Sequence, residues 1–142
     1  MADVVWHGVP EFGAALEAMT RRVDNGTKQA VRDWESLAER QIKTNATGPA
    51  RWRNGQNFPR DGGPGNVSGN LRRGIKTEGP VRRGTAWVGW VGPTAIYSRA
   101  VELGNPRWKR KKGYPFVEPA LRFINRMIPT IAARAWSRAM KR

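Results

Sequence analysis

The apolar positions of this chain follow a helical spacing at both ends and a strand-like alternation in the middle. On both sides of Asn25–Gly26, apolar residues recur every three or four positions. This spacing predicts one long amphipathic helix over residues 10–44, with a weak or kinked point at Asn25–Gly26. A helical hairpin at the same point, with Thr27 capping a second helix, is the alternative. The stripe consists of Phe12, Leu16, Met19 and Val23, followed by Ala30, Val31, Trp34, Leu37, Ala38, Gln41 and Ile42.

Residues 45–67 interrupt this periodicity with a stretch rich in glycine, proline and polar residues. Such a stretch predicts a long loop, which in a small domain is either functional or ordered only on binding. Its aromatic and arginine residues have no obvious core to join. They either fold back onto the domain surface or anchor on a neighbouring subunit, because these residue types are favoured at interfaces. The candidate interface residues are Arg51, Trp52, Arg53, Phe58 and Arg60.

Residues 68–104 are predicted to hold a short helix, a β-hairpin and a second helix. Ser68 is a suitable N-cap for the short helix. The hairpin consists of strands over residues 76–81 and 85–91 that are joined by a tight basic turn. The helix that follows ends at Gly104, because glycine is the usual residue just past a helix end.

The second strand of this hairpin is apolar on both faces. Trp87 and Val91 share one face with Gly89 between them, whereas Val88 and Trp90 share the other. A strand of this kind is either central in its sheet or faces another subunit with one side. Gly89 leaves room for the close approach of a neighbouring element.

A basic loop over residues 105–114 and a final helix over residues 115–142 complete the chain. Pro119 suits the first turn of this helix, whereas Pro129 lies inside the pattern and predicts a kink near Arg126. The apolar stripe of the helix consists of Leu121, Ile124, Ile128, Ile131, Ala135 and Met140. The tryptophans that fall on apolar stripes or strands, and that we expect in the core, are Trp34, Trp87 and Trp136.

Together these elements predict one α+β domain that comprises residues 1–142. A small antiparallel β-sheet is expected to pack against the long N-terminal helix and the C-terminal helix, with long loops between them. A short strand at Val4–Trp6 would extend the sheet. No apolar run approaches the ~20 residues of a membrane-spanning helix, and the first residues lack the features of a signal peptide.

The composition offers little material for catalysis or metal binding. The chain has one histidine, His7, and no cysteine, so a Ser-His-Asp triad or a histidine metal site would depend on His7 alone. Seven of the 11 carboxylates lie in residues 1–46, where they alternate with basic groups as on a solvated helix face. We therefore expect no enzymatic activity and no cofactor.

The net charge of +15 is concentrated towards the C-terminal end. Residues 1–46 carry a net charge of −1, residues 47–104 carry +6, and residues 105–142 carry +10. Such asymmetry indicates contact with nucleic acid or with an acidic protein surface. A basic loop could neutralise phosphates while its tryptophan stacks on a base, dock on an acidic neighbouring protein, or be merely solvated. The residues of this candidate loop are Arg107, Trp108, Lys109, Arg110, Lys111 and Lys112.

Four motifs occur in order between Ser68 and Leu121. They read Ser-Gly-Asn-Leu-Arg-Arg-Gly-Ile, a strand ending in Val-Gly, Ile-Tyr-Ser-Arg-Ala-Val-Glu-Leu-Gly, and Tyr-Pro-Phe-Val-Glu-Pro-Ala-Leu. This order resembles the neck and head–tail-joining proteins of long-tailed bacteriophages, the gp-ten-like tail-component family of HK-type siphophages. Gly74 and Leu103 depart from the pattern, since the family often has serine and an aromatic residue there. The matching fold-motif residues are Ser68, Gly69, Leu71, Gly92, Tyr97, Glu102, Gly104, Pro115, Phe116 and Pro119.

The resemblance implies a structural virion protein that is assembled in the host cytoplasm and located at the neck. Copies would form a ring, a hexamer or a dodecamer, next to head-completion, tail-terminator or tail-tube proteins and around the DNA that passes through. The matching residues Leu71, Tyr97, Val101, Phe116 and Leu121 would then belong to the core. The alternative is a non-enzymatic, basic nucleic-acid-binding protein that uses the basic loop and the arginines of the last helix.

Overall fold

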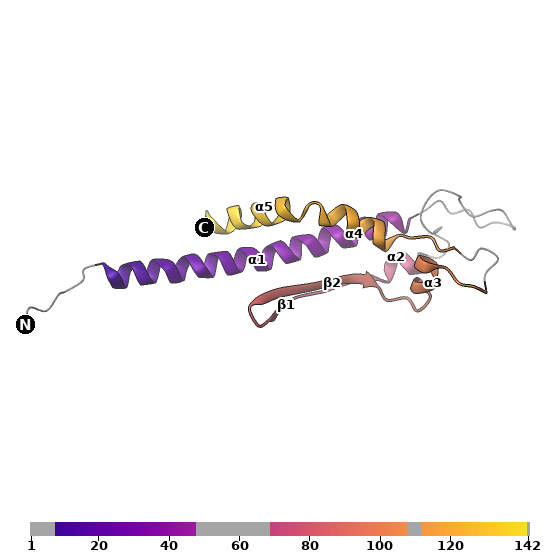
Figure 1. Ribbon diagram of the computed structural model, residues 1–142, viewed down its shortest axis with the longest axis horizontal. Helices are drawn as coiled ribbons and strands as arrows, with labels where there is room; N and C mark the ends of the chain where they lie inside the picture. The colour runs from indigo at the N-terminus through magenta and orange to yellow at the C-terminus, as the bar shows by residue number, and fades with distance from the viewer. Residues whose placement is uncertain (1–7, 48–68, 108–111, 142) are drawn as a thin grey trace, which may run out of the picture.

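The protein is an elongated molecule in which one long helix lies between a helical layer and a β-hairpin (Figure 1). The computed structural model describes residues 8–47, 69–107 and 112–141. Helices α4 and α5 run along one side of α1, and the hairpin runs along the other. The predicted α+β class is therefore confirmed. In chain order the elements are α1 (Val9–Asn45), α2 (Asn70–Arg73), β1 (Ile75–Arg83), β2 (Ala86–Pro93), α3 (Ser98–Leu103), α4 (Val117–Asn125) and α5 (Ile128–Met140).

Helix α1 is one continuous helix of 37 residues, as the long-helix prediction requires. It passes through Asn25–Gly26 without interruption, so the alternative of a helical hairpin is wrong. The Thr27 hydroxyl donates a hydrogen bond to the Val23 carbonyl inside the helix and caps nothing. Gly26 is buried beneath α5, where an added Cβ would lie 2.6 Å from Cδ1 of Trp136. The glycine therefore allows two helices to approach closely instead of ending one.

The hairpin is a two-stranded antiparallel sheet within the described residues. Its register pairs Thr77 with Val91 and Arg82 with Trp87, with an irregularity between Glu78 and Val81. The prediction that β2 is central in a larger sheet is thus wrong for the part of the chain that the structure describes. Val4–Trp6, the proposed additional strand, lies outside the described residues.

The two faces of β2 have different environments. Gly89 faces α1 so closely that an added Cβ would collide with the Glu35 carboxylate and lie 2.8 Å from Cγ1 of Val31. Trp87, on the same face, also reaches α1. The opposite face carries Trp90 and is not covered by another element of the described chain. The predicted close approach at Gly89 is confirmed.

The last helical region is divided at Arg126–Met127 into α4 and α5. Pro129 stands in the first turn of α5, where its missing N–H needs no helical partner. The kink expected near Arg126 is therefore a complete break between two helices. The break lets α4 and α5 both pack on α1.

The main core lies at the end of α1 where α2, β1 and α4 meet. The matching residues Leu71, Val101 and Leu121 pack against it. Tyr97 does not, because it is 44% exposed at the start of α3, so its predicted place in the core is wrong. No helix of the described chain has the length and apolar content needed to cross a membrane. The buried residues of this core are Ile42, Ala46, Ile75, Phe116 and Ala120.

Candidate assembly interface

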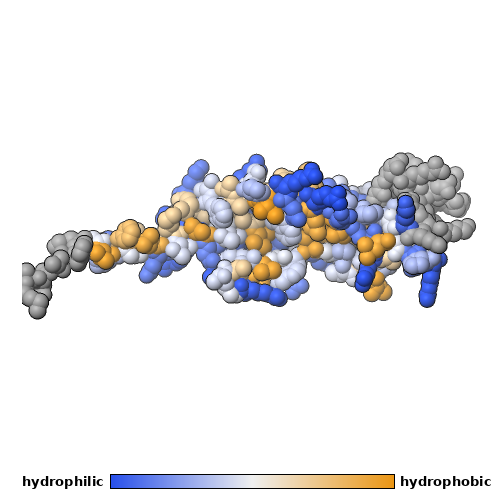
Figure 2. Space-filling view, viewed as in Figure 1, coloured by the Kyte–Doolittle hydropathy of each residue, from blue (hydrophilic) through white to orange (hydrophobic). Residues whose placement is uncertain are grey.

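The N-terminal half of α1 presents an apolar stripe that no other described element covers. Figure 1 shows the N-terminal end of the helix projecting beyond the C-terminal end of α5 and the tip of the hairpin. Apolar residues follow the projecting helix in the space-filling view (Figure 2). Their spacing of three and four residues places them on one face of the helix. The stripe consists of Val9, Phe12, Leu16, Met19 and Val23, whose exposed fractions lie between 40% and 65%.

Charge distinguishes this projecting segment from the rest of the chain. Residues 8–20 contain two acidic residues, Glu11 and Glu17, and no basic residue, in a protein whose net charge is +15. On a helical projection the two carboxylates lie on opposite sides of the apolar stripe. The segment is therefore an acidic and apolar surface on a basic protein.

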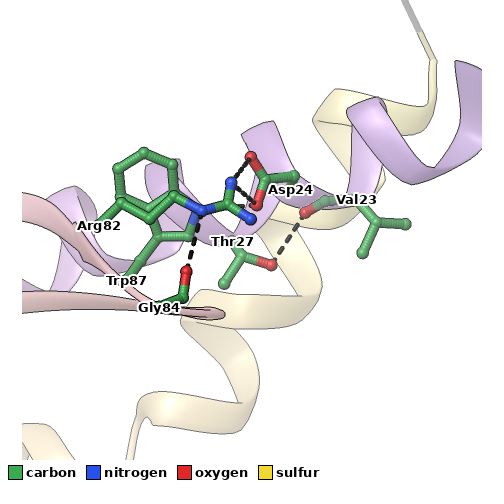
Figure 3. Close-up of polar contacts among 6 residues, drawn as sticks. All are labelled: Val23, Asp24, Thr27, Arg82, Gly84 and Trp87. Atoms are coloured by element: carbon green, nitrogen blue, oxygen red, sulfur yellow. Dashed lines mark hydrogen bonds and ion pairs between the residues drawn. The ribbon is translucent and has the colours of Figure 1, made fainter.

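The tip of the hairpin is fastened to α1 at the point where the uncovered half begins (Figure 3). Nη1 of Arg82 lies 3.0 Å from each carboxylate oxygen of Asp24. The indole Nε1 of Trp87 donates to the same carboxylate at 3.0 Å. Lys28 and Arg82 also lie over the Trp87 ring, at 5.1 and 5.6 Å from its centroid. Asp24 thus holds two strands to the helix through one side chain.

The end of α5 is fixed to α1 next to this contact. Nε1 of Trp136 donates to Oγ1 of Thr27 at 3.1 Å, and Arg138 forms an ion pair with Asp33. Trp136 is nevertheless 44% exposed, so the prediction of a core tryptophan is wrong for this residue. The described contacts of α1 with both of its neighbours therefore stop just N-terminal of Gly26.

A buried carboxylate lies under the middle of the hairpin. Glu35 is 3% exposed, and its Oε1 accepts a hydrogen bond from the backbone N–H of Trp90 at 3.2 Å. Burial raises the pKa of the Glu35 carboxyl, while that hydrogen bond and the charge of Arg32 lower it in part. Glu35 is a support of the hairpin inside the molecule and not part of an exposed site.

A second apolar surface lies at the opposite end of the molecule, between α3 and α4. It is an open groove of about 560 Å³. Leu103 is its most exposed apolar residue at 65%, while Arg99 and the ion pair between Arg122 and Glu118 add charge. The lining residues are Pro93, Ser98, Arg99, Glu102, Leu103, Val117, Glu118, Leu121, Arg122 and Asn125.

One wall of this groove is held in place by Glu102. Its Oε2 accepts hydrogen bonds from the backbone N–H groups of Phe116 and Val117 at 2.7 and 3.0 Å, and its Oε1 accepts one from Glu118 at 2.9 Å. The carboxylate thereby satisfies N–H groups at the start of α4, which have no partner within the helix. The third and fourth motifs of the sequence therefore meet in a structural contact.

The outer face of the hairpin is a third uncovered apolar surface in the described chain. Val81 and Val88 are opposite each other on this face, and Trp90 lies beside Val88. Trp90 is 38% exposed, and the guanidinium of Arg83 lies 4.8 Å from the centroid of its ring. The expectation that one face of β2 faces another subunit remains a prediction.

Most candidate residues chosen from the sequence fall outside the described chain. Arg51, Trp52, Arg53, Phe58 and Arg60, and the loop residues Trp108, Lys109, Arg110 and Lys111, belong to this group. Arg107 and Lys112 at the borders of the basic loop are exposed. The roles of the predicted interface residues therefore remain predictions.

Two surfaces cannot be identified from the sequence alone, for different reasons. The stripe on α1 is visible as a pattern, but its regular spacing indicates a core. The α3–α4 groove has no signal of its own, because its walls come from separate motifs. The order Val-Glu-Leu-Gly before Pro-Phe-Val-Glu-Pro is the one hint that Glu102 acts on α4.

No cluster of three or more histidine, cysteine, aspartate or glutamate residues suited to a metal occurs among the described residues. Comparisons of this chain with protein-family models, with curated proteins and with solved structures found no match.

Proposed function

We propose that this protein is a structural subunit of the neck of a long-tailed bacteriophage, where copies form a ring that joins the head to the tail. The order of the four sequence motifs supports this role by resemblance. The matching residues include glycines at positive φ, Gly69 and Gly104, and the helix-capping Glu102. Such residues determine the fold. The role in the virion is our inference from the resemblance.

The observation that carries the proposal is the uncovered apolar surface in three separate regions of one small chain. These regions are the stripe on α1, the outer face of the hairpin and the α3–α4 groove. Contiguous exposed apolar surface marks interaction sites on folded proteins. A ring subunit between two other structures requires several such sites, because it contacts copies of itself as well as the layers above and below.

The basic charge is compatible with a ring that surrounds DNA. Exposed arginines occur along α5 and at the break that precedes it, among them Arg134 and Arg126. Positive charge facing the channel would attract the phosphate backbone without reading its sequence. The neighbours in the assembly would be head-completion, tail-terminator or tail-tube proteins.

These exposed arginines also support the second candidate, a non-enzymatic nucleic-acid-binding protein. In that case substitution of Arg126 and Arg134 by glutamine would lower the affinity for double-stranded DNA. It would also reduce the slope of log affinity against log salt concentration by roughly 1 for each phosphate that the protein no longer neutralises. An unchanged slope would remove this candidate.

Quantitative mass spectrometry of purified particles, from the phage or prophage that encodes the chain, tests the principal proposal. A small and fixed copy number per virion, in constant ratio to the other tail-end proteins, is the expected result. Presence in infected cells together with absence from particles would reject a structural role in the virion.

A further inference from the structure

We propose that the apolar stripe of α1 in one copy docks into the α3–α4 groove of the next copy. The partner is thus a second copy of this chain, joined head to tail. The inference rests on the proposed role as an assembly subunit and deepens it, because it names the two surfaces that meet.

Shape is the first reason for pairing these surfaces. The stripe is carried by a preformed helix, and the groove is an open hollow of about 560 Å³ walled by two helices. Docking of an amphipathic helix through residues spaced by three and four is a recurring mode of recognition. Phe12 is the most exposed residue of the stripe, and Leu103 is the most exposed apolar residue of the groove, both at 65%. On each of the two surfaces, this residue is therefore the one that docking would remove furthest from water.

Charge is the second reason. Residues 8–20 contain two acidic residues and no basic one. The charged residues that line the groove are Arg99, Glu102, Glu118 and Arg122, and the flanking Arg107, Lys112 and Arg126 bring residues 93–107 and 112–126 to five basic and two acidic residues, a net charge of +3. Both acidic residues are occupied within the chain, since Glu102 accepts three backbone hydrogen bonds and Glu118 forms an ion pair with Arg122. Arg99 has no ion pair with any described residue.

The position of the two surfaces excludes their meeting within one molecule. They lie at opposite ends of the elongated chain (Figure 1). The uncovered part of α1, residues 9–23, is a straight helical segment of about 21 Å at a rise of ~1.5 Å per residue. It points away from the groove of its own chain, so that only a neighbouring copy can present the groove to it.

A contact between two different surfaces of identical subunits generates either a closed ring or an open filament. In such a contact each copy uses its stripe once and its groove once. The hairpin face then remains for other neighbours. This arrangement predicts a specific behaviour of mixed variants, which a symmetric contact of stripe with stripe does not share.

Sedimentation velocity over a range of concentrations tests the contact with two variants of exposed residues. Phe12→Asp disables the stripe, and Leu103→Asp disables the groove. We expect the unmodified chain to form oligomers larger than a dimer. Each variant alone should associate at least ~10-fold more weakly, as expected for an apolar anchor. Phe123→Asp is the matched control, because Phe123 is 53% exposed but does not line the groove, and its association should be unchanged.

An equal mixture of the two variants gives the decisive result. The intact groove of the first variant can accept the intact stripe of the second, so we expect a 1:1 heterodimer, twice the chain mass of 15.9 kDa, that grows no further. A mixture that stays monomeric, or an unmodified chain that stays monomeric, overturns the contact. Circular dichroism of each variant checks that the fold is retained.

The outcomes for the contact and for the neck role are separable. If the mixture stays monomeric while the chain is found in virions, this contact is wrong and the proposed function stands. If the heterodimer forms but the chain is absent from virions, the contact stands and the neck role fails.

Discussion

The two halves of α1 have the same helical pattern but opposite surroundings. Residues 26–45 pack against α5, α4 and the hairpin, and they include the buried Gly26, Glu35, Ala38 and Ile42. Residues 9–23 carry an equally regular apolar stripe, yet each residue of that stripe is at least 40% exposed. The difference teaches that periodicity specifies which face of a helix seeks an apolar partner, but not whether the partner belongs to the same chain.

Loss of a large buried side chain should give the largest difference between the packed and uncovered regions. Phe116 is fully buried against Ile42 and Ile75 in the core. Phe116→Ala should lower the free energy of unfolding by about 3–5 kcal/mol. Phe12→Ala, the matched change in the uncovered half, should alter it by no more than about 0.5 kcal/mol. Chemical denaturation of both variants measures this contrast, and comparable losses would show that the stripe is part of the chain's own core.

Removal of the Glu102 carboxylate should cause the next largest loss of stability. Glu102→Ala leaves three backbone N–H groups at the start of α4 without their acceptor. We expect a loss of about 2–3 kcal/mol, because unsatisfied donors are costly. Glu17→Ala in the uncovered half is the control and should change stability by less than about 0.5 kcal/mol. Thermal unfolding compares the two, and an unaffected Glu102→Ala would mean that water replaces the carboxylate at no cost.

Substitution of a glycine by alanine should change stability in opposite directions in the packed and the uncovered regions. Gly89→Ala forces a Cβ towards Val31 and the Glu35 carboxylate, so it should destabilise by about 1–3 kcal/mol. Gly13→Ala meets nothing within 4 Å in the uncovered half. It should stabilise by about 0.5–1 kcal/mol, because alanine favours a helix. Urea titrations should therefore shift in opposite directions, and a shift in the same direction would contradict the assigned surroundings.

The smallest expected change in stability is that of Glu35→Gln, and it depends on pH. Because burial raises the pKa of its carboxyl above the usual 4.5, the folded state holds the proton more tightly than the unfolded state. The free energy of unfolding therefore falls as the pH rises from about 4.5 through the raised pKa, because the buried carboxyl becomes charged over this range. Glu35→Gln keeps an oxygen acceptor for the Trp90 N–H, so it should raise the melting temperature at pH 7 by up to about 4 °C. This gain should shrink towards zero below pH 4.5.

Glu11→Gln is the control for this pH dependence. Glu11 is exposed in the first turn of α1, so the matched substitution removes a carboxylate that the hairpin does not cover. A gain for Glu35→Gln that grows as pH falls would reverse the sign of the argument and show that the charged carboxylate stabilises the hairpin.

Much of the fold can be predicted from the sequence because local signals and packing agree. Apolar spacing predicts α1 almost to its ends, and Pro129 predicts the position where the last helix divides. Gly89 predicts the close approach of a neighbouring element, which the structure identifies as α1. These residues act through backbone geometry and near neighbours, which a sequence displays directly.

The remaining features depend on contacts that sequence does not display. Gly26 has the sequence signature of a weak point, but in the structure Trp136 and Ala139 of α5 pack against it inside a continuous helix. Tyr97 matches a motif yet is exposed at the N-cap of α3. The groove cannot be predicted, since its walls come from α3 and α4, which belong to separate motifs of the sequence. The stripe is evident in the sequence, but its spacing assigns it to the core.

Hydrogen exchange at increasing protein concentration tests most directly that the uncovered half of α1 is an assembly surface. At low concentration the amides of residues 9–23 should exchange much faster than those of residues 26–45, because only the latter are packed. Protection of residues 9–23 should rise with association, together with that of residues 98–103 and 117–125 around the groove, while residues 26–45 stay unchanged. Association that leaves the exchange of residues 9–23 unaltered would contradict the account.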